Sequence, residues 1–233
     1  TKFSSWQKVD AVRLKTANGS ILKQIGPGQF AVSGENPRHE DYTITSSPAL
    51  QRVTGLRVKV KVDKNNSKGG FSKAKDGHVN LTNLKVFIRS KSTGTQKGVT
   101  LASAKATHNK RVKGKKYGAV RGILDDDPRT GWVTDGAKFK EQVIVVNFTE
   151  AQQLNNDKEV IIELKHRSLA GHESIRRFSL EFTGEFGNTS KTLGETASEE
   201  LARFNGDVSK ITSKDNSNLK EEFLYSHNVL IAA

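Results

Sequence analysis

Hydrophobic and polar residues alternate in short runs through the first 187 residues, a period that predicts β-strands. The clearest run spans residues 54–62. Its apolar members point one way and its basic members the other: Leu56, Val58, Val60 and Val62 against Arg57, Lys59 and Lys61. A strand with one apolar and one charged face is typical of an antiparallel sheet that is covered on one side only.

Further strands are predicted between clusters of Gly, Asn, Asp and Ser. The segments are 9–14, with Val12 and Leu14 facing one side, then 21–25, 29–32, 81–88, 142–148, 159–164 and 178–182. The dipeptide Asn18-Gly19 between two such runs favours a β-hairpin. Helical periodicity begins only after Thr192, at 195–202 and 219–230. We therefore expect an all-β sandwich or jelly roll over residues 1–187 and a helical tail or linker over 188–233.

Net charge then narrows the choice of partners. The chain of 233 residues carries a formal charge of +13, and residues 188–233 hold five Lys and Arg against seven Asp and Glu. The positive excess therefore lies in the predicted β part. It indicates an anionic partner, whether nucleic acid, acidic polysaccharide or an anionic surface, and the alternative is a solubilising surface without a ligand.

Other global features exclude several classes. The absence of cysteine rules out disulfides and thiolate chemistry, and no apolar run reaches the length of a membrane span, so we expect no membrane insertion. The sequence marks no Ser/His/Asp triad, phosphate-binding glycine loop or cofactor fingerprint. We expect a monomer that is not an enzyme and needs no organic cofactor. Because the chain opens on Thr1 rather than Met, we also expect a piece of a longer protein with neighbouring domains.

A carboxylate-rich turn at 123–132 is the most distinctive segment. Asp125, Asp126 and Asp127 follow one another, and adjacent carboxylates repel unless a cation or hydrogen-bond donors compensate them. One interpretation is a calcium site built from carboxylate and hydroxyl oxygens. The other is a capped turn whose carboxylates accept backbone N–H groups and pair with Arg129. Trp132 either anchors this turn in the core or stacks on a sugar ring.

Candidate ligand contacts gather on loops, where binding residues usually lie on a β scaffold. The segment 105–121 is dense in Lys and Arg, which pair with sulfate and carboxylate groups, and its Tyr117 is a candidate stacking platform. His39 lies in the predicted turn 36–41 and His166 beside Arg167 at a predicted strand end, and either histidine is a candidate for a ligand rim. The outward row of 57–61 either extends a binding face or is merely solvated. The candidate ligand residues are Arg38, His39, Arg111, Lys113, Lys115, Lys116, Tyr117, Arg129, His166 and Arg167.

Several segments together resemble a known family, the large planctomycete proteins with cytochrome c-like and associated unknown-function domains. In that family a β-rich segment lies between two unknown-function domains. The matching segments are Trp6, 17–20, 32–34, 41–44, 54–58, 76–86, 124–132, 176–180 and 193–224. The turn from Asp125 to Trp132 is also similar to that of galactose-binding, discoidin-like jelly rolls.

These resemblances imply a carbohydrate-binding type of β-sandwich in an extracytoplasmic location, either periplasmic, cell-surface or secreted. In discoidin-like modules the corresponding loop often holds a structural calcium ion. The resemblance therefore implies Asp125, Asp127 and Thr130 as calcium ligands, joined by Glu181 from the last strand.

Three functions follow. The first is a non-catalytic carbohydrate-binding module that recognises an anionic polysaccharide, sulfated or uronate-containing, within a larger protein. The second is a structural or docking module between neighbouring domains of a cytochrome-associated protein. The third, nucleic-acid binding, is less favoured because the sequence has no recognised reading motif and few aromatic residues for base stacking.

Overall fold

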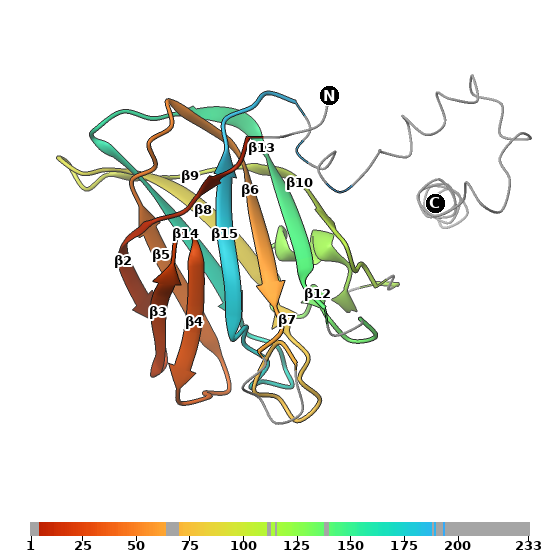
Figure 1. Cartoon of the computed structure of the whole chain (residues 1–233). Helices are drawn as coiled ribbons and strands as arrows, with labels where there is room; N and C mark the ends of the chain where they lie inside the picture. The colour runs from red at the N-terminus through yellow and green to blue at the C-terminus, as the bar shows by residue number, and fades with distance from the viewer. Residues whose placement is uncertain are drawn as a thin grey trace, which may run out of the picture.

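The protein is an all-β sandwich with mostly antiparallel sheets (Figure 1). A computed structural model describes residues 5–63, 70–110, 113–114, 116–137, 140–187, 189 and 193. The helical tail predicted over 188–233 therefore falls almost entirely outside the described residues. Within them the one helix with described bounds is the 3₁₀ turn η1 (Val120–Ile123), and no described helix is long and apolar enough to cross a membrane.

The first layer is a seven-stranded sheet. Its order is β10 (Leu101–Ala106), β13 (Gln142–Gln153), β6 (Arg52–Lys61), β15 (Arg177–Thr183), β4 (Gln29–Gly34) and β3 (Ser20–Gly26). A short strand, β1 (Gln7–Lys8), pairs with β15 beyond the end of β4. The strand β6 is therefore central and pairs antiparallel with β13 and β15, as its alternating pattern predicts.

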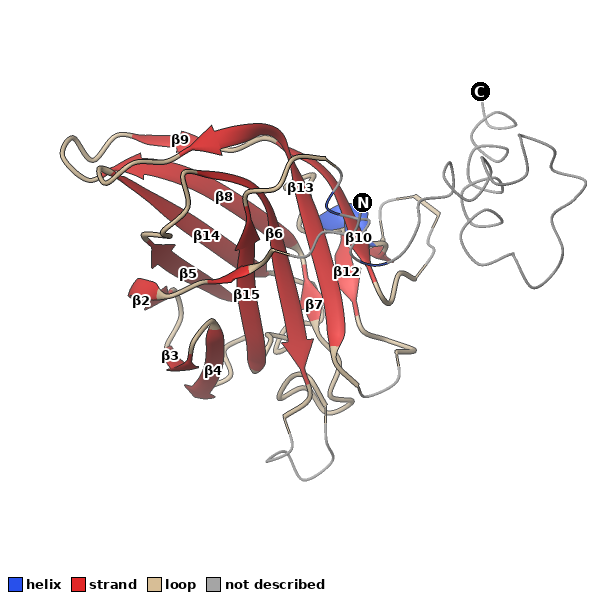
Figure 2. Cartoon of the chain, turned by 45° about the horizontal axis from the view of Figure 1, so that its top comes forward, coloured by secondary structure: helices blue, strands red, loops and turns tan. Residues whose placement is uncertain are grey.

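The second layer is a five-stranded sheet (Figure 2). Its order is β2 (Ala11–Thr16), β5 (Glu40–Ser46), β14 (Lys158–His166), β8 (Asn83–Ser90) and β9 (Gln96–Gly98). A small third sheet joins β11 (Tyr117–Gly118), β12 (Gly131–Val133) and β7 (Asn80–Leu81).

The core lies between the two large sheets and is formed by the inward half of each strand. On β6 the predicted inward residues Leu56, Val58 and Val60 are fully buried. Trp132 is also fully buried, and its indole Nε1 donates to the His108 carbonyl at 2.7 Å. Its predicted role as the anchor of the aspartate turn is confirmed.

Two local predictions are wrong. Asn18-Gly19 does not close a hairpin, because β2 pairs with β5 in one sheet and β3 pairs with β4 in the other. The turn instead joins the two layers of the sandwich. Val12 does not share a face with Leu14, because a β-bulge between Ala11 and Arg13 leaves the Val12 side chain 65% exposed.

The predicted strand at 81–88 is divided. Asn80 and Leu81 belong to β7 of the small sheet, and β8 begins at Asn83 in the five-stranded sheet. Thr82 lies between them, and both its N–H and its hydroxyl donate to the Lys165 carbonyl, at 2.8 and 2.9 Å. These bonds hold the break against β14.

Candidate functional site

The aspartate turn is closed by hydrogen bonds between its own members. The Asp125 carboxylate accepts the Thr130 hydroxyl at 2.7 Å and the Asp127 N–H at 3.0 Å. The Asp127 carboxylate accepts Arg129 Nε at 2.9 Å and Arg129 Nη2 at 2.8 Å. Donors within the turn thus compensate both carboxylates, which favours the capped-turn interpretation.

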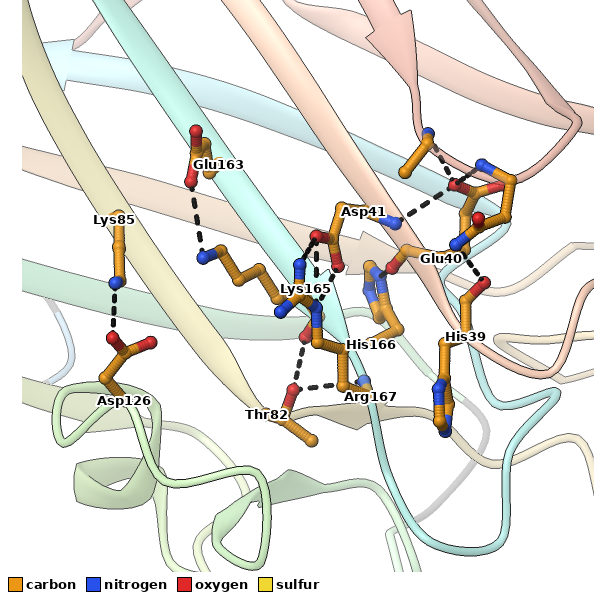
Figure 3. Close-up of polar contacts among 12 residues, drawn as sticks. His39, Glu40, Asp41, Thr82, Lys85, Asp126, Glu163, Lys165, His166 and Arg167 are labelled. Carbon is orange, nitrogen blue, oxygen red and sulfur yellow. Dashed lines mark hydrogen bonds and ion pairs between the residues drawn. The ribbon is translucent and has the colours of Figure 1, made fainter.

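The third carboxylate of the turn, that of Asp126, contacts a side chain of the neighbouring sheet. Asp126 has a left-handed backbone conformation, with φ of 57°, and its carboxylate pairs with Lys85 on β8 at 2.5 Å (Figure 3). The hydrogen bond from the Lys85 ammonium holds the pKa of Asp126 below its usual value. Asp126 therefore ties the turn to the outer face of the five-stranded sheet.

The structure does not bring Glu181 to this turn. Glu181 lies on the outer face of β15, where its carboxylate contacts Arg57 and Lys59. In the described part of the chain, no group of three or more His, Asp or Glu side chains is placed to hold a metal ion. A calcium ion held by Asp125, Asp127 and Thr130 stays a prediction, and Glu181 is not part of that set.

The loop that follows β14, residues 167–172, gathers several predicted ligand residues. The Arg38 guanidinium donates to the Leu169 carbonyl at 3.0 Å, and His39 Nε2 contacts the Ser168 carbonyl at 3.1 Å. The Tyr117 hydroxyl accepts the Leu169 N–H at 3.0 Å and donates to the Pro128 carbonyl at 2.7 Å. The sandwich therefore places residues from three distant segments around one exposed loop.

Most charges near this loop are already paired. The Arg167 guanidinium donates to both oxygens of the Asp41 carboxylate, and this hydrogen bonding raises the pKa of Arg167. Lys165 lies 3.6 Å from Glu163 on the same strand. Figure 3 shows these pairs together with Lys85–Asp126 across the outer face of the five-stranded sheet. At this end of the sheet each of these cations is paired with a carboxylate, which weakens its attraction for an acidic polymer.

His166, expected at a ligand rim, lies in the interior and is not accessible. Burial lowers the pKa of its imidazole to about 4, so the ring is neutral near pH 7. Its Nδ1 contacts the Glu40 carbonyl at 3.1 Å, and the ring packs 4.8 Å from Tyr42. The alternation of β14 accounts for this position, since residues 160, 162 and 164 also point inward.

The basic loop is only partly described. Lys113 and Lys116 are exposed, whereas Arg111 and Lys115 lie outside the described residues. Tyr117 is half-buried on β11, and its hydroxyl is used by the contacts to Leu169 and Pro128. Nothing in the described loop gathers these cations at one point.

The outer face of the seven-stranded sheet is the surface where cations do gather. Strand pairing aligns Lys61 with Arg177, Lys59 with Ser179 and Arg57 with Glu181. Lys8 pairs with Glu181 from β1, and Lys23 pairs with Ala31 beside Arg177. We call the resulting set the basic face: Lys8, Lys23, Arg57, Lys59, Lys61 and Arg177.

Carboxylates are scarce on the basic face. In the described part of these aligned rows Glu181 is the single acidic residue, and it accepts Arg57 Nε at 2.5 Å and lies 3.0 Å from Lys59 Nζ. Burial raises the pKa of Glu181, but hydrogen bonds from Arg57 and Lys59 outweigh it, so the pKa is lowered and the group is ionised. At the rim, Asp63 lies 3.8 Å from Arg177.

Sequence reasoning noticed only one strand of this face. The alternation of β6 identifies Arg57, Lys59 and Lys61 as an outward row. Arg177 comes from β15, which lies beside β6, and Lys23 comes from β3, two strands further along the sheet, so both join this row only once the sheet order is known. The alternation within each strand was enough to predict that these side chains point outward. It was not enough to predict which strands lie next to one another.

Comparison with known proteins adds no identification. No protein-family model, curated protein or solved structure matches this chain. The resemblances to the planctomycete segment and to discoidin-like jelly rolls therefore stay predictions.

Proposed function

We propose that this chain is a non-catalytic carbohydrate-binding module, and that its basic face recognises an anionic polysaccharide carrying sulfate or uronate groups. The observation that supports it most is the contrast between the two faces of the sandwich. On the five-stranded sheet four carboxylates, Asp41, Asp126, Glu159 and Glu163, pair with neighbouring cations. The aligned rows of the basic face hold one carboxylate, Glu181.

The spacing on a sheet suits an extended polymer better than a single small anion. Neighbouring strands lie about 4.8 Å apart, and alternate residues on one strand about 6.7 Å apart. The cations therefore form a flat array in which several groups contact successive charges of one chain. Each exposed contact is weak and screened by salt, so affinity is expected to come from their number.

Exposure differs between members of the array. The side chain of Arg57 is 15% exposed and that of Lys59 is 25% exposed, whereas that of Arg177 is 40% exposed. Lys8 and Lys23 are exposed and Lys61 is half-buried. The ligand is therefore expected to contact Lys8, Lys23, Lys61 and Arg177. The less exposed Arg57 and Lys59 add to the positive potential of the face without direct contact.

The proposal has finer parts that rest on the sequence. They are a galactose-binding-like jelly roll, an extracytoplasmic location and a place among neighbouring domains of a longer protein. A calcium ion in the aspartate turn would stabilise the fold and take no part in binding the polymer. The buried Trp132 after that turn supports the likeness to discoidin-like modules.

Affinity electrophoresis tests the proposal. The protein is run through gels that contain heparin, alginate or a neutral glucan at rising sodium chloride. We expect retardation by the two acidic polymers that fades between about 0.05 and 0.5 M salt, and none by the glucan. Equal retardation by all three polymers, or none by either acidic polymer at low salt, rejects the proposal.

A further inference from the structure

The outer face of the five-stranded sheet contains an open hollow of about 580 Å³ at the start of β14, the end opposite to the residues of Figure 3. It is lined by two arginines, a lysine, a glutamate, two serines, a glycine and a valine. These are Val12, Arg13, Ser47, Arg89, Ser90, Lys91, Gly94 and Glu159.

One carboxylate in this hollow is shared by two guanidinium groups. Glu159 has a side chain that is 7% exposed, and it accepts Arg89 Nε at 2.5 Å. Arg13 Nη2 lies 3.3 Å from both of its oxygens. Lys91 adds a third cation, and its ammonium donates to the Asn156 carbonyl. The lining therefore keeps a net positive charge, with Glu159 orienting the two arginines from below.

The bulge in β2 builds the open side of the hollow. Ala11 pairs with Ser46 and Arg13 with Thr45, so β2 carries one extra residue at this point. The extra residue is Val12, which stands 65% exposed beside Arg13, whose side chain is 51% exposed. A cationic pair thus lies next to an apolar contact surface, a combination that suits a ligand with an acidic group on an apolar ring face.

We propose that this hollow is a subsite for a single acidic sugar residue. Its carboxylate or sulfate ester pairs with Arg13 and Arg89, and the C–H face of its ring covers Val12. This subsite goes beyond the proposed function because it lies on the other sheet from the basic face. It recognises one acidic group on one sugar, whereas the basic face recognises a run of charges.

The test is a titration of the ¹⁵N-labelled protein followed by NMR, with glucuronate, glucose 6-sulfate, glucose and inorganic sulfate as separate probes. We expect saturable shifts at Arg13, Arg89 and Lys91 with both acidic sugars. Glucose and inorganic sulfate are expected to bind at least about tenfold more weakly, since each lacks one of the two contacts.

Three variants make the test specific. Arg13→Gln and Val12→Asp are each expected to weaken glucuronate binding at least about fivefold, and Glu159 stays paired with Arg89 in both. Lys97→Gln on β9 removes a charge from the same sheet outside the lining and is expected to change nothing. The proposal is overturned by the absence of saturable shifts, by inorganic sulfate binding as tightly as glucuronate, or by equal binding in Arg13→Gln and wild type. Because the basic face is tested with polymers, failure of one site is distinguishable from failure of the other.

Discussion

The guanidinium carbon of Arg57 lies 4.2 Å from the centre of the Trp6 ring, while Arg57 Nε donates to Glu181. The indole therefore covers the guanidinium on one side, and the Glu181 carboxylate holds it from the adjacent strand. This stacking places the residue before β1 against the central strand β6. It also explains why the side chain of Arg57 is less exposed than those of Lys59 and Arg177.

Replacing Glu181 with Gln is expected to act in opposite directions on stability and on binding. The loss of an ionised acceptor for Arg57 and Lys59 should cost about 1–3 kcal/mol in free energy of unfolding. The same change removes the single carboxylate of the basic face and should tighten binding to heparin. Urea denaturation and affinity electrophoresis measure the two effects, and weaker binding by a folded Glu181→Gln variant would contradict the proposed face.

The acid sensitivity of the fold should depend on His166. Its pKa in the folded protein is about 4, below the ordinary value of 6.5. The unfolded chain therefore binds the proton more readily between these values, and stability falls as the pH falls from 6.5 to about 4. The full effect is on the order of 3 kcal/mol.

The measurement is the urea midpoint as a function of pH for wild type and for His166→Gln. We expect the variant to lose less stability across that window. A histidine NMR signal assigned to His166 that titrates near 6.5 would show instead that the ring is accessible to water.

The aspartate turn offers a test that separates its two interpretations. Asp125→Ala removes the carboxylate that accepts the mostly buried Thr130 hydroxyl and the Asp127 N–H, and should lower the free energy of unfolding by about 1–2 kcal/mol. If the turn is capped by its own donors alone, calcium and EGTA give the same melting temperature in the wild type. A melting temperature that rises with calcium in wild type and not in Asp125→Ala would establish the metal site.

Glu40 is expected to be more important for stability than any carboxylate of the aspartate turn. Its fully buried carboxylate accepts the backbone N–H groups of Ala17, Asn18, Ser20 and Asp41 at 2.8–3.0 Å. Burial raises the pKa of Glu40, but these bonds and the Ser20 side chain outweigh it, so the pKa is lowered.

Glu40→Ala takes this acceptor from the buried Ser20 N–H and from three part-buried N–H groups, and should cost at least about 3 kcal/mol, measured by urea denaturation. Glu35→Ala serves as the control, at an exposed position at the start of the β4–β5 connection, with an expected effect within about 0.5 kcal/mol. Similar midpoints for the two variants would show that the turn does not depend on the Glu40 carboxylate.

The sequence predicted strands well and their partners poorly. The alternation of β6 fixed its inward residues, because a period of two depends only on neighbouring positions. The hairpin predicted at Asn18-Gly19 was wrong because this turn is stabilised by Glu40, a residue more than twenty positions away. No local sequence pattern connects the two. The β2 bulge that exposes Val12 depends in the same way on pairing with β5.

The same limit applies to the candidate sites. The cluster of Arg38, His39 and Tyr117 around residues 167–172 was predicted residue by residue, but the hydrogen bonds that engage them require the fold. The basic face depends on the strand order β6, β15, β4 and β3, and the hollow at Arg13 depends on Glu159 lying opposite Arg89 on the adjacent strand. Long-range pairing of this kind leaves no signal in a single sequence.

The central claim is tested most directly by reversing charge on one sheet at a time. Lys23→Glu/Lys61→Glu changes two cations of the basic face, and Lys15→Glu/Lys97→Glu makes the same change in charge on exposed positions of the five-stranded sheet. Heparin binding is measured for both double variants at low salt. The account predicts that the first variant binds at least about tenfold more weakly than wild type and the second less than about threefold more weakly. Equal loss in both variants would contradict it.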